Sequence, residues 1–541
     1  MDLPELTRTI APHLSACGLQ ACALVCKTWH AAFQPLVWST LIVNHGYFPL
    51  GAPHCSVTRR DGCAADALCK HCVWERSVAH NGHHVRHLKL EFPFNDPQCP
   101  ECLGLLHQHC TSLKGLEYLK PMSNDDLVDK LIARNPRIKS LSTYKIACLQ
   151  QSMAVLSHLT KLDFRGELGV QDVVSVLEAF PRLQELSISG DIVDFQRLVV
   201  SDISTEEEDR SRWHSSLSSS PSLKRLSMLS SARADISPIL ERCPNIEWLQ
   251  FPGMQTVWDA TLNVLRSGLF SRLTTLSCAC LKDADEFERV LQAIPHLQLR
   301  NVSLCDPAAS TIQALAKYHG QRLERLNLFY LLSIPENPLV VALSQFPALK
   351  SLIMETLSLY CTRLKLPDLR ELINQPWSCS QLEHLDIPVT LERQQDAHID
   401  AGEENGTPLS QSDPAVAEWE QAQTLFMERL GALTRLRQIQ LWGYWKGRYQ
   451  PGCDVTWRLS AGLGKLQGLR HLEGLYLGYP QHKLEITELQ WMKQHFVRLK
   501  KLEVCGIEDG PLHDWLHDHW PELSVVDLNK VNDLDDDLID Y

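Results

Sequence analysis

Apolar and polar positions repeat along this chain in a block of the form Leu-x-x-Leu-x-Leu, in which Ile, Val or Phe can replace Leu. Because the apolar residues of the block alternate, each block predicts a short β-strand with one buried face. About sixteen blocks occur, mostly 21 to 28 residues apart. Clear blocks begin at Leu159, Leu183, Leu223, Ile246, Leu273, Leu323, Leu349, Leu382, Leu436, Leu472 and Leu499, and weaker ones at Val85, Leu113, Ile138, Leu299 and Leu523.

The stretches between blocks have helical spacing. Val173, Val176, Leu177 and Phe180 form one stripe after a candidate cap at Asp172. Similar stripes lie in residues 126–133, 311–318, 340–346 and 490–496. A proline, which cannot continue a helix, often stands two residues before the next block. These prolines are Pro136, Pro181, Pro221, Pro244, Pro347 and Pro521.

A unit of strand, turn, helix and turn with this period is typical of leucine-rich repeats. Parallel strands stack about 4.8 Å apart whereas helices need roughly 8 to 10 Å, so a strand layer facing a helix layer must bend. We therefore predict an α/β fold: a curved solenoid over residues 85–530, with strands on the concave side and helices on the convex side.

The spacing is interrupted at several places. Residues 46–84 form a Cys/His-rich connecting segment, and polar or aromatic insertions are expected near 201–220, 391–418 and 442–453. Residues 531–541 form an acidic tail.

Charge and cysteine content narrow the classes of partner. The net charge of −13 disfavours binding to nucleic-acid phosphates. The chain starts Met-Asp-Leu-Pro-Glu, without a signal peptide, and contains no apolar run of about 18 residues, so we expect no membrane contact. Its 19 cysteines fit reduced, mostly buried thiols, which indicates a cytoplasmic or nuclear protein.

Two cysteine pairs have the spacing of zinc ligands, namely Cys69 with Cys72 and Cys99 with Cys102. The 26 residues between the pairs exceed the usual spacing in zinc ribbons, and cysteines packed against the first repeat are the alternative. We predict no bound metal and no other cofactor.

The sequence also contains no phosphate-binding glycine loop, no Gly-x-Ser-x-Gly and no His-Glu-x-x-His, so we expect no enzymatic activity.

Residues 3–41 read Leu-Pro-Glu-Leu-x3-Ile-x3-Leu-x4-Leu-x2-Cys-x-Leu-Val-Cys-Lys-x-Trp-x6-Leu-x-Trp-x2-Leu, which resembles an F-box over its whole length. Gly18 departs from the family, which commonly has Asp or a similar cap before the second helix. The resemblance implies a three-helix F-box in residues 1–45 that binds the Skp-type adaptor of a cullin-RING ubiquitin ligase. The residues implied in adaptor binding are Leu3, Pro4, Ile10, Leu14, Leu19, Leu24, Val25, Trp29 and Trp38.

The number of large apolar residues in this segment also favours a domain that binds a partner. Three short helices cannot bury so many large apolar side chains, so some of them should face a partner. The alternative is that these helices only cap the end of the solenoid. With the repeats behind it, the chain resembles the substrate-recognition subunit of an SCF-type ubiquitin ligase; a protein-binding scaffold outside any ligase is the second hypothesis.

A protein substrate is expected on the concave strand face of the C-terminal half. Strand alternation exposes Arg325, Asn327 and Phe329 in one unit, Gln438, Gln440 and Trp442 in another and Tyr476 in the next. Aromatic residues and Arg are frequent interface anchors. We therefore select as substrate-binding candidates Arg325, Phe329, Trp442, Tyr444, Trp445, Arg448 and Tyr476. The aromatic residues at 442–450 could instead fold back as a plug over the edge of the solenoid.

Overall fold

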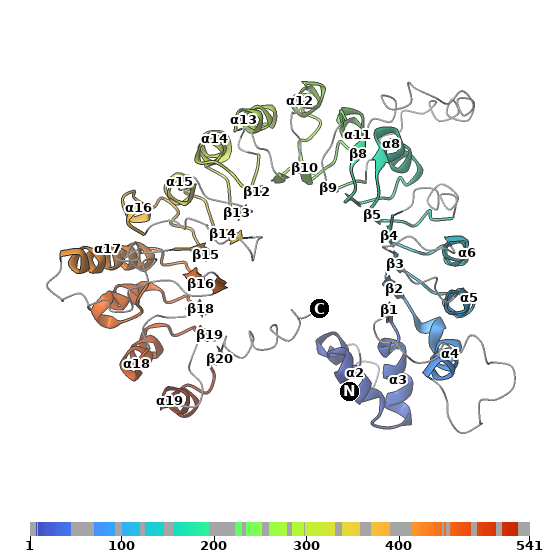
Figure 1. The fold of residues 1–541 in the computed structure, drawn as a ribbon, viewed down its shortest axis with the longest axis horizontal. Helices are drawn as coiled ribbons and strands as arrows, with labels where there is room; N and C mark the ends of the chain where they lie inside the picture. Colours follow the sequence, from blue (N-terminus) through green and yellow to red (C-terminus); the bar gives the residue numbers. More distant parts are fainter. Residues whose placement is uncertain are drawn as a thin grey trace, which may run out of the picture. The chain divides into compact units, whose positions relative to one another are not determined.

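The structure is a computed structural model of the 541-residue chain (Figure 1). It describes residues 7, 9–44, 70–91, 100–118, 125–144, 155–193, 222–229, 234–251, 259–278, 284–296, 298–330, 338–356, 369–389, 414–445, 448–450, 455–477, 484–504 and 511–527. The chain forms two compact units, Met1–Pro252 and Gly253–Tyr541.

Unit 1 contains a sheet of parallel strands in sequence order, preceded by N-terminal helices. The strands are β1 (Thr40–Asn44), β2 (His87–Glu91), β3 (Gly115–Tyr118), β4 (Ser140–Thr143), β5 (Lys161–Phe164), β7 (Glu185–Ile188), β9 (Arg225–Met228) and β10 (Trp248–Phe251). The helices are η1 (Ala11–His13), α2 (Ala16–Ala23), α3 (Lys27–Val37), α4 (Lys70–Asn81), η3 (Gly82–His84), α5 (Pro100–His109), α6 (Asp125–Arg134), α8 (Val170–Ala179) and α11 (Ser237–Glu241). A small parallel pair, β6 (Leu168–Gly169) and β8 (Ile192–Val193), lies beside α8.

Unit 2 repeats the arrangement, again with parallel neighbours in sequence order. The strands are β11 (Thr275–Cys278), β12 (Asn301–Cys305), β13 (Arg325–Tyr330), β14 (Ser351–Thr356), β15 (His384–Pro388), β16 (Gln438–Trp445), β18 (Gly474–Tyr476), β19 (Lys501–Val504) and β20 (Ser524–Asp527). The helices are α12 (Asp259–Arg266), α13 (Ala284–Ala293), α14 (Ala309–His319), α15 (Pro338–Gln345), α16 (Leu369–Ile373), α17 (Pro414–Gly431), η6 (Leu459–Ala461), η7 (Leu463–Gly468), α18 (Ile486–His495) and α19 (Pro511–His519). The short strand β17 (Arg448–Gln450) pairs antiparallel with the end of β16.

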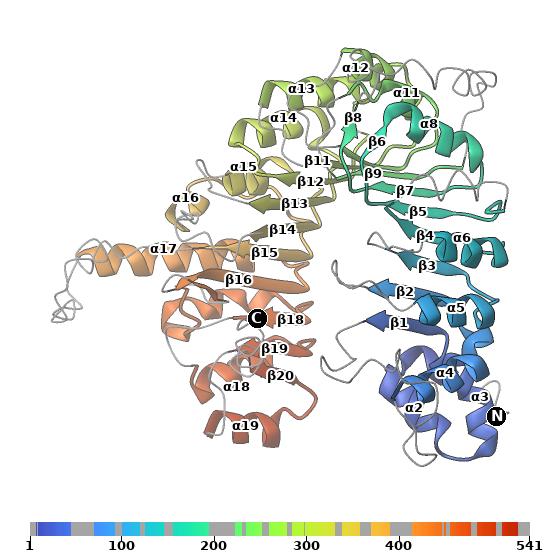
Figure 2. The ribbon, with the colours of Figure 1, turned by 45° about the vertical axis from the view of Figure 1, so that its right-hand side comes forward.

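The predicted α/β repeat is confirmed. Every block named from the sequence contains a strand, and in each unit the helices that connect successive strands lie on one side of the strand layer (Figures 1 and 2). In β13 the alternating Leu326 and Leu328 are fully buried. They face the helix layer, where Ile312 and Leu315 of α14 are also fully buried. The core of each unit therefore lies between its strands and its helices.

The predicted prolines stand in turns that end one repeat and begin the next. In the turn from Phe180 to Leu183, the Leu183 N–H donates to the Phe180 carbonyl at 3.0 Å, and Pro181 occupies the second position. The turn from Phe346 to Leu349 has the same hydrogen bond at 3.2 Å around Pro347. Proline favours this position of a β-turn because its ring fixes φ near −65°. Pro221 lies outside the described residues.

A buried asparagine ties two early repeats together. Asn135, which follows α6, donates to the carbonyls of Cys110 and Leu131 at 2.9 Å each. Its Oδ1 accepts from the Leu113 N–H, also at 2.9 Å. The side chain thus satisfies backbone groups on both sides of the turn, which would otherwise be buried without partners.

The structure differs from the sequence prediction in three segments. Thr40–Asn44, placed with the N-terminal helical domain, is the first strand of the sheet. Lys70–Asn81, placed in the connecting segment, is helix α4. Residues 442–453, expected to be a loop, include the hairpin of β16 and β17.

The predicted helix cap at Asp172 is also corrected. Helix α8 starts at Val170, so Asp172 lies in its first turn, where its carboxylate accepts a hydrogen bond from the Gly169 N–H at 3.0 Å.

The insertion near 201–220 and the tail 531–541 lie outside the described residues, as do residues 391–413 of the insertion at 391–418. Within the described part of the chain, no helix has both the length and the apolar character that crossing a membrane requires.

Candidate protein-interaction surfaces

The N-terminal helices pack around a small core. Helix α2 begins after Ser15, whose Oγ accepts a hydrogen bond from the Gly18 N–H at 3.2 Å. Ser15 therefore provides the cap, and Gly18 lies within the first turn. In α3, Phe33 is fully buried and stacks with Trp29 at a ring-centroid distance of 5.3 Å. Helices α2 and α3 pack side by side (Figure 1).

The turn between α2 and α3 presents two large apolar side chains to solvent. Leu24 is 77% exposed and Val25 is 64% exposed, and Ile10 before η1 is 37% exposed. Burying a side chain of this size is worth about 1.5 to 3 kcal/mol, so the turn would gain free energy from a covering partner. Other candidates from the sequence are half-buried: Leu14, Leu19, Trp29 and Trp38. Leu3 and Pro4 lie outside the described residues.

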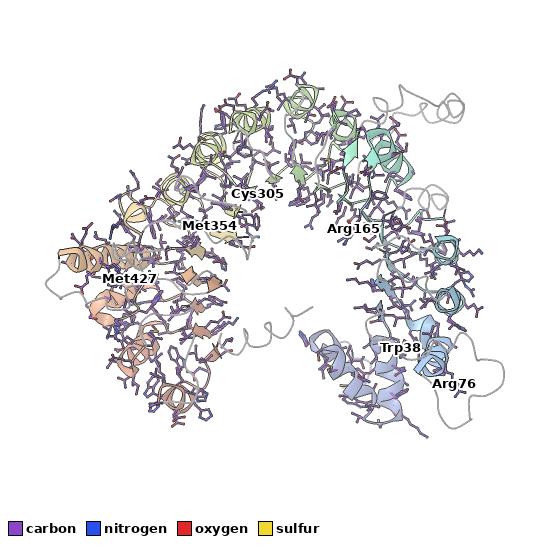
Figure 3. The ribbon with its side chains drawn as sticks, in the orientation of Figure 1. Trp38, Arg76, Arg165, Cys305, Met354 and Met427 are labelled. Atoms are coloured by element: carbon purple, nitrogen blue, oxygen red, sulfur yellow. The ribbon has the colours of Figure 1, made fainter. Side chains whose placement is uncertain are left out.

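Helix α3 continues into the sheet without a linker. Trp38 caps α3 (Figure 3), and the carbonyl of Ser39 accepts from the N–H groups of Arg86 and His87 at 2.9 Å each. Strand β1 starts at the next residue and pairs in register with β2. The N-terminal helices and the first repeat are therefore directly joined, which fixes the direction in which the α2–α3 turn points.

The strand face of unit 2 is mainly polar. The Asn301 side chain donates to Thr275 at 3.0 Å, and the Asn327 side chain donates to Ser303 at 3.5 Å, each across to the preceding strand. Of the predicted anchors on β13, Arg325 is exposed and Phe329 is half-buried. Phe329 stands in register with Cys305 on β12, a residue labelled in Figure 3.

Tyr476 is held in place rather than projecting freely. The Nζ of Lys501 lies 5.2 Å from the centre of the Tyr476 ring and also forms an ion pair of 2.5 Å with Glu503. A Cβ at Gly474 would approach the same ring to 3.1 Å, so the absence of a side chain there leaves room for it. Tyr476 is half-exposed on the strand face, and its role as a binding anchor stays a prediction.

The aromatic segment that follows β16 is a hairpin. Trp442 stands in register with Pro388, and the antiparallel pairs that follow are Tyr444 with Tyr449 and Trp445 with Arg448. The side chains of Trp442, Tyr444, Trp445 and Arg448 lie outside the described residues, so the plug alternative is untested. Trp457, which follows the hairpin in the chain, is buried in unit 2. It was not among the candidate residues predicted from the sequence.

A row of alternating charges runs across unit 2 at the residues that immediately precede the strands, which we name the strand-start row. The carbonyls of the row residues accept N–H groups from the next repeat: the Arg300 carbonyl accepts from Glu324 and Arg325, and that of Lys500 accepts from Ser524. The row in unit 2 begins at the neutral Thr274 and continues with Arg300, Glu324, Lys350, Glu383, Arg437, Glu473 and Lys500. The sequence analysis did not identify this row. An alignment of the blocks would have shown it, because the residue after the first leucine is charged in most blocks of unit 2 and the sign alternates.

Neighbouring side chains of this row form ion pairs. Glu324 lies 3.2 Å from Arg300 and 2.8 Å from Lys350, and the hydrogen bond from Lys350 holds the pKa of Glu324 below its usual range. Glu473 similarly lies 3.7 Å from Arg437 and 3.5 Å from Lys500. Each exposed pair contributes little to stability, but together they nearly neutralise this edge of unit 2.

The described cysteines include several inert thiols. Burial raises the pKa of Cys110, Cys243 and Cys379 to about 12, so these groups stay protonated at neutral pH. Among the residues whose side chains are described, no cluster of His, Cys, Asp or Glu could hold a metal ion. The zinc candidates Cys69 and Cys99, and the side chains of Cys72 and Cys102, lie outside those residues.

No protein-family model matches the chain, and no curated protein matches it. Among solved structures, the chain is similar to one from the crystal structure of the Rad7 and Elc1 complex in yeast. The alignment covers 85% of this chain and 88% of that chain, at 12% sequence identity and a TM-score of 0.33. A TM-score of this size does not establish a common overall fold, and no functional conclusion is drawn from it.

Proposed function

We propose that the chain is the substrate-recognition subunit of an SCF-type ubiquitin ligase, with an F-box at the N-terminus and leucine-rich repeats behind it. The observation that carries the proposal is the exposure of Leu24 and Val25 on a turn that is joined without a linker to the repeats. These two residues belong to the segment of the sequence that resembles an F-box. The adaptor-binding candidates are this turn with Ile10, Leu14, Leu19, Trp29 and Trp38.

The repeats would hold a protein substrate, and the chain would perform no chemistry itself. Its contribution would be proximity: a substrate lysine held near a charged ubiquitin-conjugating enzyme reacts as if in an intramolecular step. The direct junction of α3 with β1 suits this role because it limits the relative motion of the adaptor-binding turn and the first repeats. Such a protein acts in the cytoplasm or the nucleus, where the ligase operates.

The second candidate function is a protein-binding scaffold outside any ligase. It rests on the polar strand face of unit 2 and on Tyr476, which would bind a partner equally well without ubiquitin transfer. Affinity purification of the full chain from proteasome-inhibited cells separates the two functions. The ligase function predicts recovery of both a Skp-type adaptor and a cullin, whereas a scaffold recovers no cullin.

A variant makes this experiment specific. Leu24→Asp with Val25→Asp places charges on the exposed turn and should remove adaptor and cullin together. Val497→Asp is the matched control, because Val497 is also 70% exposed but lies in unit 2. Equal recovery of adaptor by the double variant and by the control would reject the proposed docking turn.

A further inference from the structure

The strand-start row of unit 1 has the same backbone geometry as that of unit 2 but a different charge pattern. The carbonyl of Arg86 accepts from the N–H groups of Lys114 and Gly115, and the carbonyl of Lys114 accepts from those of Lys139 and Ser140. The row consists of Ser39, Arg86, Lys114, Lys139, Thr160, Gln184, Lys224 and Glu247. It therefore places three cations, Arg86, Lys114 and Lys139, on consecutive repeats with no anion between them.

These three cations have no acidic partner in the described part of the chain. Arg86 donates to the backbone carbonyl of Ser112 at 3.0 Å, and Lys114 and Lys139 are exposed and form no ion pair there. In unit 2 the same row brings neighbouring charges to within 3.2 and 2.8 Å around Glu324. Because strands stack about 4.8 Å apart, three adjacent cations repel one another, and an added anion would relieve that repulsion.

The positive character of this edge also affects a nearby histidine. Burial lowers the pKa of His84, and the charges of His83, Arg86 and His80 lower it further. Two carboxylates on the neighbouring strands β3 and β5 are paired with cations outside the row. Glu117 lies 3.5 Å from Lys89, and Asp163 lies 3.1 Å from Arg165.

The residues that directly follow two of the cations are small. Gly115 and Ser140 are the first residues of β3 and β4, directly after Lys114 and Lys139. A Cβ at Gly115 would come within 2.6 Å of the His87 Nδ1, so the His87 ring lies against the backbone of β3. The exposed His87 ring therefore covers the buried Gly115 next to Lys114, and Ser140 next to Lys139 is half-buried.

We propose that Arg86, Lys114 and Lys139 form a docking strip for an acidic segment of the protein substrate. The inference rests on the proposed function, since it names the chemistry of the substrate. The cations are spread along a line at strand spacing, which fits carboxylates distributed along a peptide. Two of the three cations are solvated lysines. A lysine cannot form the paired hydrogen bonds with which an arginine binds a single phosphate, so the strip does not favour a phosphate group. The net charge of −13 disfavours a nucleic acid.

The test measures binding of a fluorescein-labelled, Glu/Asp-rich peptide to the full-length protein by anisotropy, without any adaptor. Lys114→Gln with Lys139→Gln should weaken binding about tenfold, the upper range for loss of two exposed ion pairs. The matched control is Lys350→Gln with Lys500→Gln, which removes two cations of the same row that are already paired, and it should change affinity by less than about twofold. Binding should also weaken when NaCl rises from about 50 mM to about 300 mM.

Several results would overturn the strip. These are equal binding of a peptide with Gln and Asn in place of Glu and Asp, an equal loss of affinity in the control, or no loss in the Lys114/Lys139 variant. Tighter binding of single-stranded DNA or of a singly phosphorylated neutral peptide, with the same dependence on Lys114 and Lys139, would reject an acidic protein segment as the partner. Because no adaptor is present, these outcomes are independent of whether the α2–α3 turn binds one.

Discussion

Gln34 of α3 donates a hydrogen bond of 3.2 Å to Asn81, the last residue of α4. Asn81 is only 6% exposed, and its own amide donates to the Ser77 carbonyl at 3.1 Å. The pair links the N-terminal helices to the first repeat, in addition to the backbone hydrogen bonds at Ser39. Asn81 thereby helps to hold α3 against the sheet.

Asn81→Ala should loosen α3. Loss of a part-buried hydrogen bond costs about 1.4 kcal/mol, so amide hydrogen exchange in α3 should accelerate about tenfold, with no change in α18. Hydrogen exchange with mass spectrometry reads both helices in one sample. Gln108→Ala, an exposed polar position on α5, is the control. Unchanged exchange in α3 would show that the pair does not hold the helices to the repeat.

The buried side-chain amide of Gln423 holds α17 to the segment that follows the hairpin in the chain. The Gln423 side chain is fully buried and donates to the carbonyls of Thr456 at 2.7 Å and Ala461 at 2.9 Å, while its Oε1 accepts from the Thr456 N–H at 3.0 Å. Gln423→Leu leaves these groups buried without partners and should lower the free energy of unfolding by roughly 3 kcal/mol. Gln421→Leu, two residues away and exposed, should change it by less than about 0.5 kcal/mol. Urea denaturation measures both, and similar midpoints would contradict the role of Gln423.

His319 makes unit 2 sensitive to acid. The side chain is fully buried at the end of α14, 6.4 Å from the His296 ring, and burial lowers the pKa of His319 to about 4. Since the unfolded chain binds a proton near pH 6.5 and the folded chain does not, stability is constant above pH 6.5 and falls as the pH drops towards 4. At pH 5 the loss is about 2 kcal/mol relative to pH 7.5.

His319→Phe should remove this part of the pH dependence, whatever its effect at neutral pH. His517→Gln is the control, because that imidazole is 81% exposed. Urea midpoints at pH 7.5 and pH 5 give the comparison. If the difference between the two pH values is the same in wild type and in His319→Phe, the buried imidazole does not titrate as stated.

The docking strip predicts a gain of binding in unit 2. Glu324→Lys removes the anion between Arg300 and Lys350 and so reproduces the three consecutive cationic positions of unit 1. The full-length variant should bind a second acidic peptide, seen as a doubling of the stoichiometry in calorimetry. Glu288→Lys changes the charge equally but on α13, outside the row, and should leave the stoichiometry at that of the wild type. An equal gain in both variants would indicate nonspecific charge attraction.

The sequence predicted the repeats well because burial of alternating residues determines the strands. Leu162 and Phe164, or Leu326 and Leu328, are buried as their spacing indicates. Strand β1 was missed because its residues adjoin the F-box-like segment and lack the leading leucine of the block. The hairpin at 442–450 was read as a loop because Lys446-Gly447 lacks the Asn-Gly or Asp-Gly pair that is typical of two-residue hairpin turns.

Side-chain exposure was harder to predict than the strands. The sequence showed an excess of apolar residues in the first forty positions, but it could not separate Leu24 and Val25, which face solvent, from Trp29, which packs on Phe33. That distinction depends on how α2 and α3 pack. The strip of Arg86, Lys114 and Lys139 was missed because its members are far apart in the chain and come together only when the strands align.

The measurement that tests the central claim most directly is the dissociation constant for a purified Skp-type adaptor, determined by calorimetry with the full-length chain. Two central apolar anchors contribute on the order of 2 kcal/mol each, so Leu24→Asp with Val25→Asp should weaken binding at least about a hundredfold. Val497→Asp should bind as the wild type does. The absence of wild-type binding, or equal affinity of the double variant, would contradict the assignment of the α2–α3 turn as the adaptor-binding surface.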